Sequence, residues 1–148
     1  MNRGPGARNV RSGLGELLRY RRRPAMGGLI HRNFDQPDET RPFEAGTGRL
    51  DLVSTEGGAV GRAVFEPGWR WSLHIKPLAG TDSCQSAHTG YVVSGRMKLV
   101  MDDGESADLG PGEFIRIAPG HDAWVLGDEP CVVLDWTGYG DYAKPDAG

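Results

Sequence analysis

The segments that decide the fold are Gly90-Tyr91-Val92-Val93-Ser94-Gly95-Arg96-Met97 and, further along, Gly110-Pro111-Gly112-Glu113 with Ala118-Pro119-Gly120-His121. Around them, residues 68–123 hold three of the four histidines of the chain. Glycine accepts the positive φ that tight turns need, so Ser94-Gly95 and Asp103-Gly104 predict compact hairpin turns. We therefore expect this region to consist of short strands joined by tight turns.

Turn residues recur about every eight to twelve residues over most of the chain, a spacing typical of all-β sandwiches and barrels. The expected strands are Leu50–Ser54, Ala59–Phe65, Arg70–Lys76, Thr89–Val93, Arg96–Met101, Ser106–Leu109, Glu113–Ile117, Ala123–Leu126 and Val132–Trp136. A helical spacing of leucines occurs in Arg11–Arg22. Because a jelly roll is the commonest closure of eight such strands, we predict an all-β jelly-roll barrel.

Alternation of polar and apolar residues predicts which side chains face the interior. In Arg96–Met101 the apolar positions are Met97, Leu99 and Met101, which should point inward. In Trp69–Lys76 tryptophan, leucine and isoleucine alternate with Arg70, Ser72, His74 and Lys76. If this segment is a strand, His74 and Lys76 share a polar face, which is either solvent-exposed or part of a pocket.

The two glycine-punctuated segments resemble the two motifs of the cupin superfamily, over about residues 60–136. The resemblance implies a double-stranded β-helix with one metal pocket, and frequent dimerisation. In the family, the first motif supplies two histidines and a glutamate and the second supplies a histidine. Here His74 matches the first histidine, Lys76 falls where the second belongs, His88 replaces the glutamate and Ala123 replaces the last histidine.

The remaining ligands suggest a rebuilt metal site. His121 precedes Ala123 by two residues, so both side chains would point to the same face of a strand. Cys84 lies in a long insertion between Lys76 and His88. Three imidazoles and a thiolate favour a divalent transition metal, zinc above all, over Mg²⁺ or Ca²⁺. We expect the ligands His74, Cys84, His88 and His121, with four ligands closing the site and three leaving it open for catalysis.

Other interpretations remain open. Each histidine can be a solvated or hydrogen-bonded structural residue, and Cys84 an ordinary loop thiol. In a pocket without metal, Lys76 would bind a carboxylate or phosphate of a small molecule. A Cys84–His88 nucleophile and base would lack a third, orienting group in the sequence. The protein is therefore expected to be a metal-binding or small-molecule-binding cupin, as a sensor or accessory module; the alternative is a metal-dependent enzyme with oxygenase, isomerase or hydrolytic chemistry.

Length and charge divide the chain unevenly. At 148 residues it suits one domain. Residues 1–24 contain seven arginines and one glutamate, a charge of +6, which leaves −9 on residues 25–148 because the whole chain carries −3. We expect a flexible or helical basic extension over residues 1–25, with Met26 an alternative start. After it we expect an arm and first strand over residues 26–58, the barrel over 59–138 and a C-terminal tail over 139–148.

The composition also limits the partners. No stretch of 18 apolar residues occurs, so no membrane span is expected. The acidic barrel argues against nucleic-acid binding. Two cysteines and no secretory leader favour a reducing cytoplasm. The expected partners are a small-molecule ligand and a second copy of the chain.

Overall fold

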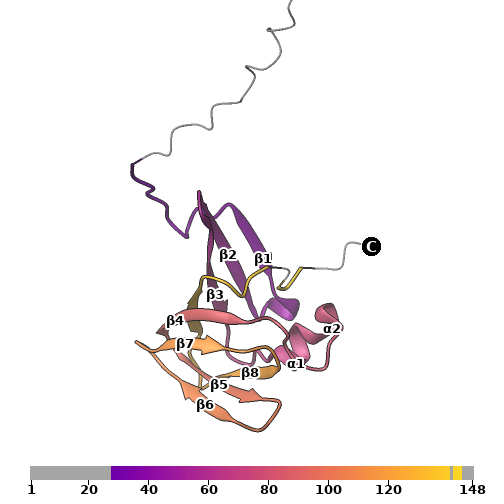
Figure 1. Ribbon diagram of the computed structural model, residues 1–148. Coiled ribbons are helices and arrows are strands. Elements are labelled where there is room, and N and C mark those ends of the chain that lie inside the picture. The colour runs from indigo at the N-terminus through magenta and orange to yellow at the C-terminus, as the bar shows by residue number, and fades with distance from the viewer. Residues whose placement is uncertain (1–27, 141, 145–148) are drawn as a thin grey trace, which may run out of the picture.

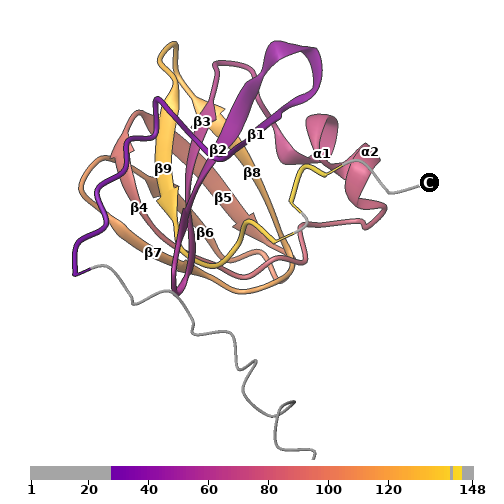
Figure 2. The same ribbon diagram turned by 90° about the horizontal axis from the view of Figure 1, so that it is seen from above.

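The structure, a computed structural model, describes residues 28–140 and 142–144, which form nine strands in two sheets (Figures 1 and 2). The larger sheet has the order β1-β2-β3-β9-β4-β7 and the smaller one β6-β5-β8. The strands are β1 (Glu39–Pro42), β2 (Gly48–Thr55), β3 (Gly58–Phe65), β4 (His88–Ser94), β5 (Arg96–Met101), β6 (Ser106–Leu109), β7 (Phe114–Ile117), β8 (His121–Leu126) and β9 (Cys131–Asp135). All pairings are antiparallel. The predicted all-β jelly roll is confirmed.

Tight turns require glycine where the sequence suggested it. Gly95 joins β4 to β5 with φ +72°, and a side chain there would lie 2.1 Å from the carbonyl oxygen of Pro130. Gly104 has φ +93° in the turn between β5 and β6. L-residues with a side chain rarely adopt such angles. Both predicted hairpin turns are therefore present.

The core lies between the two sheets. Along β8 buried and half-buried residues alternate strictly, so His121, Ala123 and Val125 share the inner face. Met97 and Leu99 of β5 are buried as expected, and Met101 packs against them half-buried. Because alternate side chains of a strand face the same side, the cavity of the barrel is lined by every second residue of these strands.

The expected strand Arg70–Lys76 is wrong, because these residues form two short helices, α1 (Trp71–His74) and α2 (Lys76–Ala79). The amide of Ile75 donates to the carbonyl of Trp71 at 2.9 Å, which places these two residues one above the other, both 2% exposed. Leu73, expected on the same face, is 64% exposed. The alternating pattern hid a helical spacing of four residues, and Gly80, with φ +68°, ends α2.

One end of the barrel is covered by α1, α2 and the C-terminal segment, meaning the described residues that follow β9. These parts lie together in both views (Figures 1 and 2). Buried Arg41 of β1 holds this segment, because its Nη1 donates to the carbonyls of Tyr139, Gly140 and Tyr142 at 2.6, 2.8 and 3.0 Å. Tyr139 and Tyr142 pack against the core. Residues placed in the expected tail thus contribute to the barrel interior.

Two sequence expectations lie outside the described residues: the helix over Arg11–Arg22 and the basic extension over residues 1–25. Within the described part of the chain, no helix is long and apolar enough to cross a membrane.

Candidate metal centre

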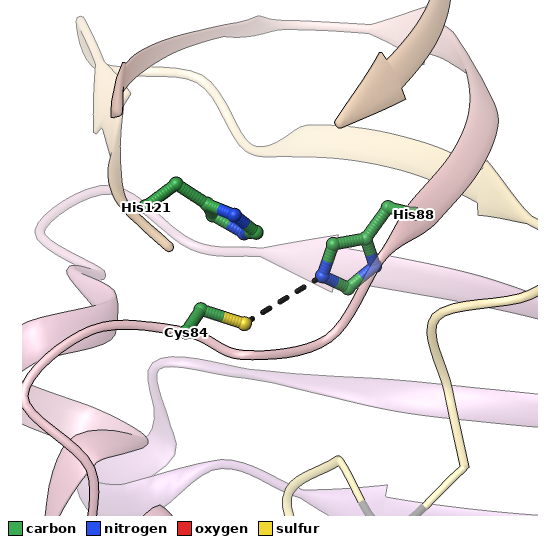
Figure 3. A group of neighbouring side chains, drawn as sticks. All are labelled: Cys84, His88 and His121. Carbon is green, nitrogen blue, oxygen red and sulfur yellow. Dashed lines mark hydrogen bonds between the residues drawn. The ribbon is translucent and has the colours of Figure 1, made fainter. Parts of the chain in front are cut away.

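Cys84, His88 and His121 converge inside the barrel (Figure 3). One potential ligand atom from each residue lies within 4.8 Å of the other two. Sγ of Cys84 is 3.7 Å from Nε2 of His88. Two ligands at about 2.0 and 2.3 Å from one tetrahedral ion are separated by about that much, so the spacing suits a common metal ion.

Backbone pairing positions Cys84 beside His121. The two residues form an isolated β-bridge, in which the amide of Cys84 donates to the carbonyl of His121 at 2.8 Å. The amide of Gly120 donates to the carbonyl of Cys84 at 2.7 Å. The insertion therefore folds back along the start of β8 and leaves Cys84 only 2% exposed.

His88 is oriented by Asp135 at the end of β9. Nδ1 of His88 lies 2.6 Å from Oδ2 of Asp135, while Oδ1 accepts the amides of Thr137 and Gly138 at 2.9 and 2.8 Å. A carboxylate on one ring nitrogen of a histidine fixes the ring and leaves the other nitrogen for a metal. This contact turns Nε2 toward Cys84.

His121 has an equivalent arrangement with a backbone group. Its Nδ1 lies 2.9 Å from the carbonyl oxygen of Ala118, which requires the hydrogen on Nδ1 and leaves Nε2 to bind. His121 is the first residue of β8 and 3% exposed, on the same inner face as Ala123. The expectation that His121 reaches the interior beside Ala123 is confirmed.

Burial would raise the pKa of the Cys84 thiol, but hydrogen bonds and charge from His121 and His88 outweigh it and lower the pKa from 9.0 to about 6. For His88, burial alone would lower the pKa, while Asp135 and Cys84 raise it to about 9. Burial, with the charges of Cys84 and Asp135, raises the pKa of Tyr142 well above its usual value. The cluster thus favours a thiolate, the form of cysteine that binds metals.

A cavity of about 60 Å³ adjoins the cluster, room for an ion and a very small molecule. Its wall is mostly apolar. The lining residues are Leu50, Ala63, Phe65, Trp69, Trp71, Cys84, His88, Met97, Leu99, Leu109, Ile115, Ile117, His121, Ala123, Val133, Asp135, Gly138, Tyr139 and Tyr142. Tyr142 packs edge-on against His88, with 5.8 Å between the ring centres.

The structure brings together three of the four predicted ligands and leaves His74 outside. His74 ends helix α1, with its Nδ1 3.0 Å from the amide of Arg70, because the segment is not the strand that would have aimed it inward. Lys76 does not line the cavity and lies 3.7 Å from exposed Asp82. Neither residue occupies the position expected for it.

Asp135 is the site residue that sequence reasoning missed. It ends an apolar strand in which Cys131, Val133 and Asp135 alternate with half-buried positions. A carboxylate at an inward-facing position of such a strand is the sequence feature that could have identified Asp135 as a site residue. It is also the third group that the sequence did not offer for a Cys84–His88 pair.

Comparison with known proteins identifies the domain. Residues 82–137 match the sequence profile of the cupin domain. This part of the chain is a cupin domain. No curated protein sequence matches it.

Solved structures with a similar fold share little sequence with this chain. KdgF from Halomonas sp. shares 20% identity over 77% of this chain and 96% of that one, with a TM-score of 0.51. The polyketide cyclase RemF from Streptomyces resistomycificus shares 20% over 72% and 77%, with a TM-score of 0.51. Ectoine synthase from P. lautus shares 10% over 74% and 78%, with a TM-score of 0.52. At these identities the likeness concerns the cupin fold alone.

Proposed function

We propose that this cupin binds one divalent transition metal ion, zinc, through Cys84, His88 and His121, and takes a small molecule into the adjoining cavity. The observation that carries the proposal is the convergence of the three ligand atoms within 4.8 Å. Two imidazoles and a thiolate suit zinc, whereas Mg²⁺ and Ca²⁺ prefer oxygen ligands. Asp135 and the Ala118 carbonyl supply the outer contacts that metal-binding histidines usually have.

Three protein ligands, rather than the four first expected, support an open site. Structural zinc sites are closed by four protein ligands, whereas catalytic ones keep a position for water or substrate. Here the cavity lies beside the three ligands. A metal bound there would polarise an oxygen of whatever occupies the cavity.

The favoured role is a sensor or accessory module that binds a small ligand at the metal. The second candidate is a metal-dependent enzyme, favoured by the same open position. Turnover separates the two: a sensor binds its ligand and releases it unchanged, whereas an enzyme returns a product.

Metal analysis of the full chain, purified without an affinity tag, tests the site. We expect about one zinc per chain, lost in Cys84→Ser, His88→Ala and His121→Ala. His74→Ala is the matched control, because His74 lies outside the cluster, and it should keep its metal. Far-ultraviolet circular dichroism shows whether each variant is folded. Metal retained in all three folded ligand variants would sink the proposal.

We also propose that two copies associate through the outer face of β4 and β7. Tyr91 and Phe114 are register partners there and are 39% and 67% exposed, with Val93 46% exposed nearby. Exposed apolar groups gathered in one place often mark an interface. Light scattering should give a dimer, and Phe114→Glu a monomer; a monomeric unmodified chain would contradict this.

We propose the cytoplasm as the compartment, since Cys84 and Cys131 are both free thiols. Cell fractionation tests this, and recovery of the protein outside the cytoplasm would contradict it.

A further inference from the structure

The wall of the cavity beside the metal cluster is built from inward-facing apolar side chains of both sheets. The smaller sheet supplies Met97 and Leu99 of β5, and the larger one supplies Ile115 and Ile117 of β7 with Val133 of β9. All five are buried, and each alternates along its strand with less buried neighbours. Because alternate side chains of a strand face the same side, an occupant of the cavity meets hydrocarbon from both sheets.

The polar residues of the wall offer an occupant few partners away from the metal. The indole nitrogens of Trp69 and Trp71 are fully buried, so an occupant does not reach them. The hydroxyl of Tyr139 donates to a backbone carbonyl at 2.6 Å. The ring of Tyr142 packs against a histidine of the cluster, at the metal end of the cavity. A hydroxyl or amide carried into the apolar part would therefore be buried without a hydrogen bond, which costs free energy.

The charges on the wall oppose a charged occupant as well. Among the described residues that line the cavity, none is an arginine or a lysine. The carboxylate of Asp135 lines it, and both of its oxygens are engaged by His88 and by backbone amides. A negative group in the apolar part would thus have no countercharge, and a positive group would have no free carboxylate oxygen. The tail of an occupant should be uncharged.

The volume of the cavity limits the length of that tail. The cavity measures about 60 Å³. An apolar cavity of about 150 Å³ in another protein admits benzene, so this one has room for an aliphatic chain of about three carbons. At the other end, zinc held by one thiolate keeps a positive charge, and zinc deprotonates a thiol that coordinates it. The head of the occupant should therefore be a group that becomes an anion on the metal.

We infer that this cavity takes a short, uncharged aliphatic thiol or alcohol, which binds the metal through its sulfur or oxygen and packs its carbon chain against Leu99 and Ile115. The inference rests on the proposed metal site and names the class of small molecule that it would take. On coordination the head loses its proton to water, and the tail stays neutral. The aliphatic wall residues are then specificity residues, distinct from the three metal ligands.

The test uses the full chain loaded with cobalt, whose content is measured before and after each titration. The visible cobalt spectrum and calorimetry follow ligand binding without oxygen. Propanethiol and mercaptoethanol are the matched probes, because they share the thiol head and the chain length and differ in a terminal methyl or hydroxyl group. We expect propanethiol to bind at least about tenfold more tightly, since the hydroxyl of mercaptoethanol would be buried without a partner.

Benzenethiol is the probe for size, and it should not bind the unmodified protein. Leu99→Ala and Ile115→Ala each remove part of the wall from a different sheet, and a folded variant of either kind should gain benzenethiol binding. Leu73→Ala is the matched control, because Leu73 is 64% exposed and does not line the cavity, so it should still exclude benzenethiol. Circular dichroism shows which variants are folded.

Four results would overturn the inference while leaving the metal site intact. Loaded protein could bind none of the thiols, or bind mercaptoethanol as tightly as propanethiol, which would show a partner for the hydroxyl. The unmodified protein could bind benzenethiol, or the folded Leu99→Ala and Ile115→Ala variants could both still exclude it, which would show that these side chains do not set the size. A chain that takes up no cobalt would defeat the proposed function and this inference together.

Discussion

Nδ1 of His88 lies 2.6 Å from Oδ2 of Asp135, and the two side chains join β4 to β9 at the base of the metal cluster. Gly138 lies directly against this contact. A methyl group at position 138 would lie 1.8 Å from Nδ1 of His88 and 2.6 Å from Oδ2 of Asp135. Only glycine therefore fits against this pair.

Gly138→Ala should disrupt the His88–Asp135 contact. Overpacking should cost about 1–3 kcal/mol of unfolding free energy. Loss of the outer contact should weaken zinc binding about 10–100-fold, measured by competition with a chromogenic chelator. Gly140→Ala is the matched control, since a methyl group there meets nothing within 4 Å. Equal zinc affinities for the two variants would show that the contact does not support the site.

The ionisation of Cys84 should be visible in the metal-free protein. Its pKa is lowered to about 6, so ultraviolet absorbance of the thiolate should rise with a midpoint near that pH. Cys131, whose pKa burial raises to about 11, should stay silent until much higher pH. Zinc affinity should fall as pH drops through about 6, because the proton competes for the sulfur. A Cys84 midpoint near the ordinary value of 9 would contradict the arrangement.

Removal of Cys84 should make the unfolding free energy of the metal-free protein depend on pH. The lowered pKa of Cys84 stabilises the folded protein increasingly as pH rises from about 6 to 9. The raised pKa of His88 stabilises it fully below 6.5, and this contribution is lost as pH rises to about 9. The two effects oppose each other, so the unfolding free energy of the metal-free protein should be nearly flat from about 6.5 to 9.

In Cys84→Ala the contribution of His88 remains, sustained by Asp135, and the unfolding free energy should fall with rising pH over that window. Urea unfolding at several pH values measures this. A flat profile in the variant would mean that His88 is not held as an imidazolium.

Arg41 should control access to the cavity. Arg41→Met removes the donor shared by the carbonyls of Tyr139, Gly140 and Tyr142. We expect a loss of about 1–3 kcal/mol in unfolding free energy. We also expect a thiol reagent to modify Cys84 faster, because the C-terminal segment is no longer held by Arg41. Glu39→Gln is the control, since it weakens the partly exposed ion pair of Arg41 and leaves the Nη1 donor of Arg41 in place. If Cys84 reacts at the same rate in both variants, the segment does not cover the site.

Strand periodicity predicted most of the barrel, because alternate burial on a sheet leaves a clear pattern. Arg96–Met101 and Ser106–Leu109 agree with β5 and β6 at both ends. β1 was not predicted, because Glu39–Pro42 is polar and contains proline, which sheets tolerate at an edge. The strand predicted for residues 70–76 was wrong because their apolar spacing fits both a strand and a helix. The packing of Trp71 and Ile75 in the core favours the helix.

The site was predictable in part for the same reason. His121 could be placed from its two-residue distance to Ala123, and Cys84 and His88 from the expected convergence at one end of the barrel. The prediction that His74 is a metal ligand depended on a strand at residues 70–76, which the chain does not form. The role of Asp135 depends on its contact with His88 across distant strands, which spacing along the chain does not reveal.

X-ray absorption at the zinc edge, on full-length protein loaded with one zinc, tests the central claim most directly. The account predicts one sulfur neighbour at about 2.3 Å and imidazole nitrogens at about 2.0–2.1 Å. His74→Ala should give the spectrum of the unmodified protein. A first shell without sulfur, or one that changes when His74 is removed, would contradict a site built from Cys84, His88 and His121.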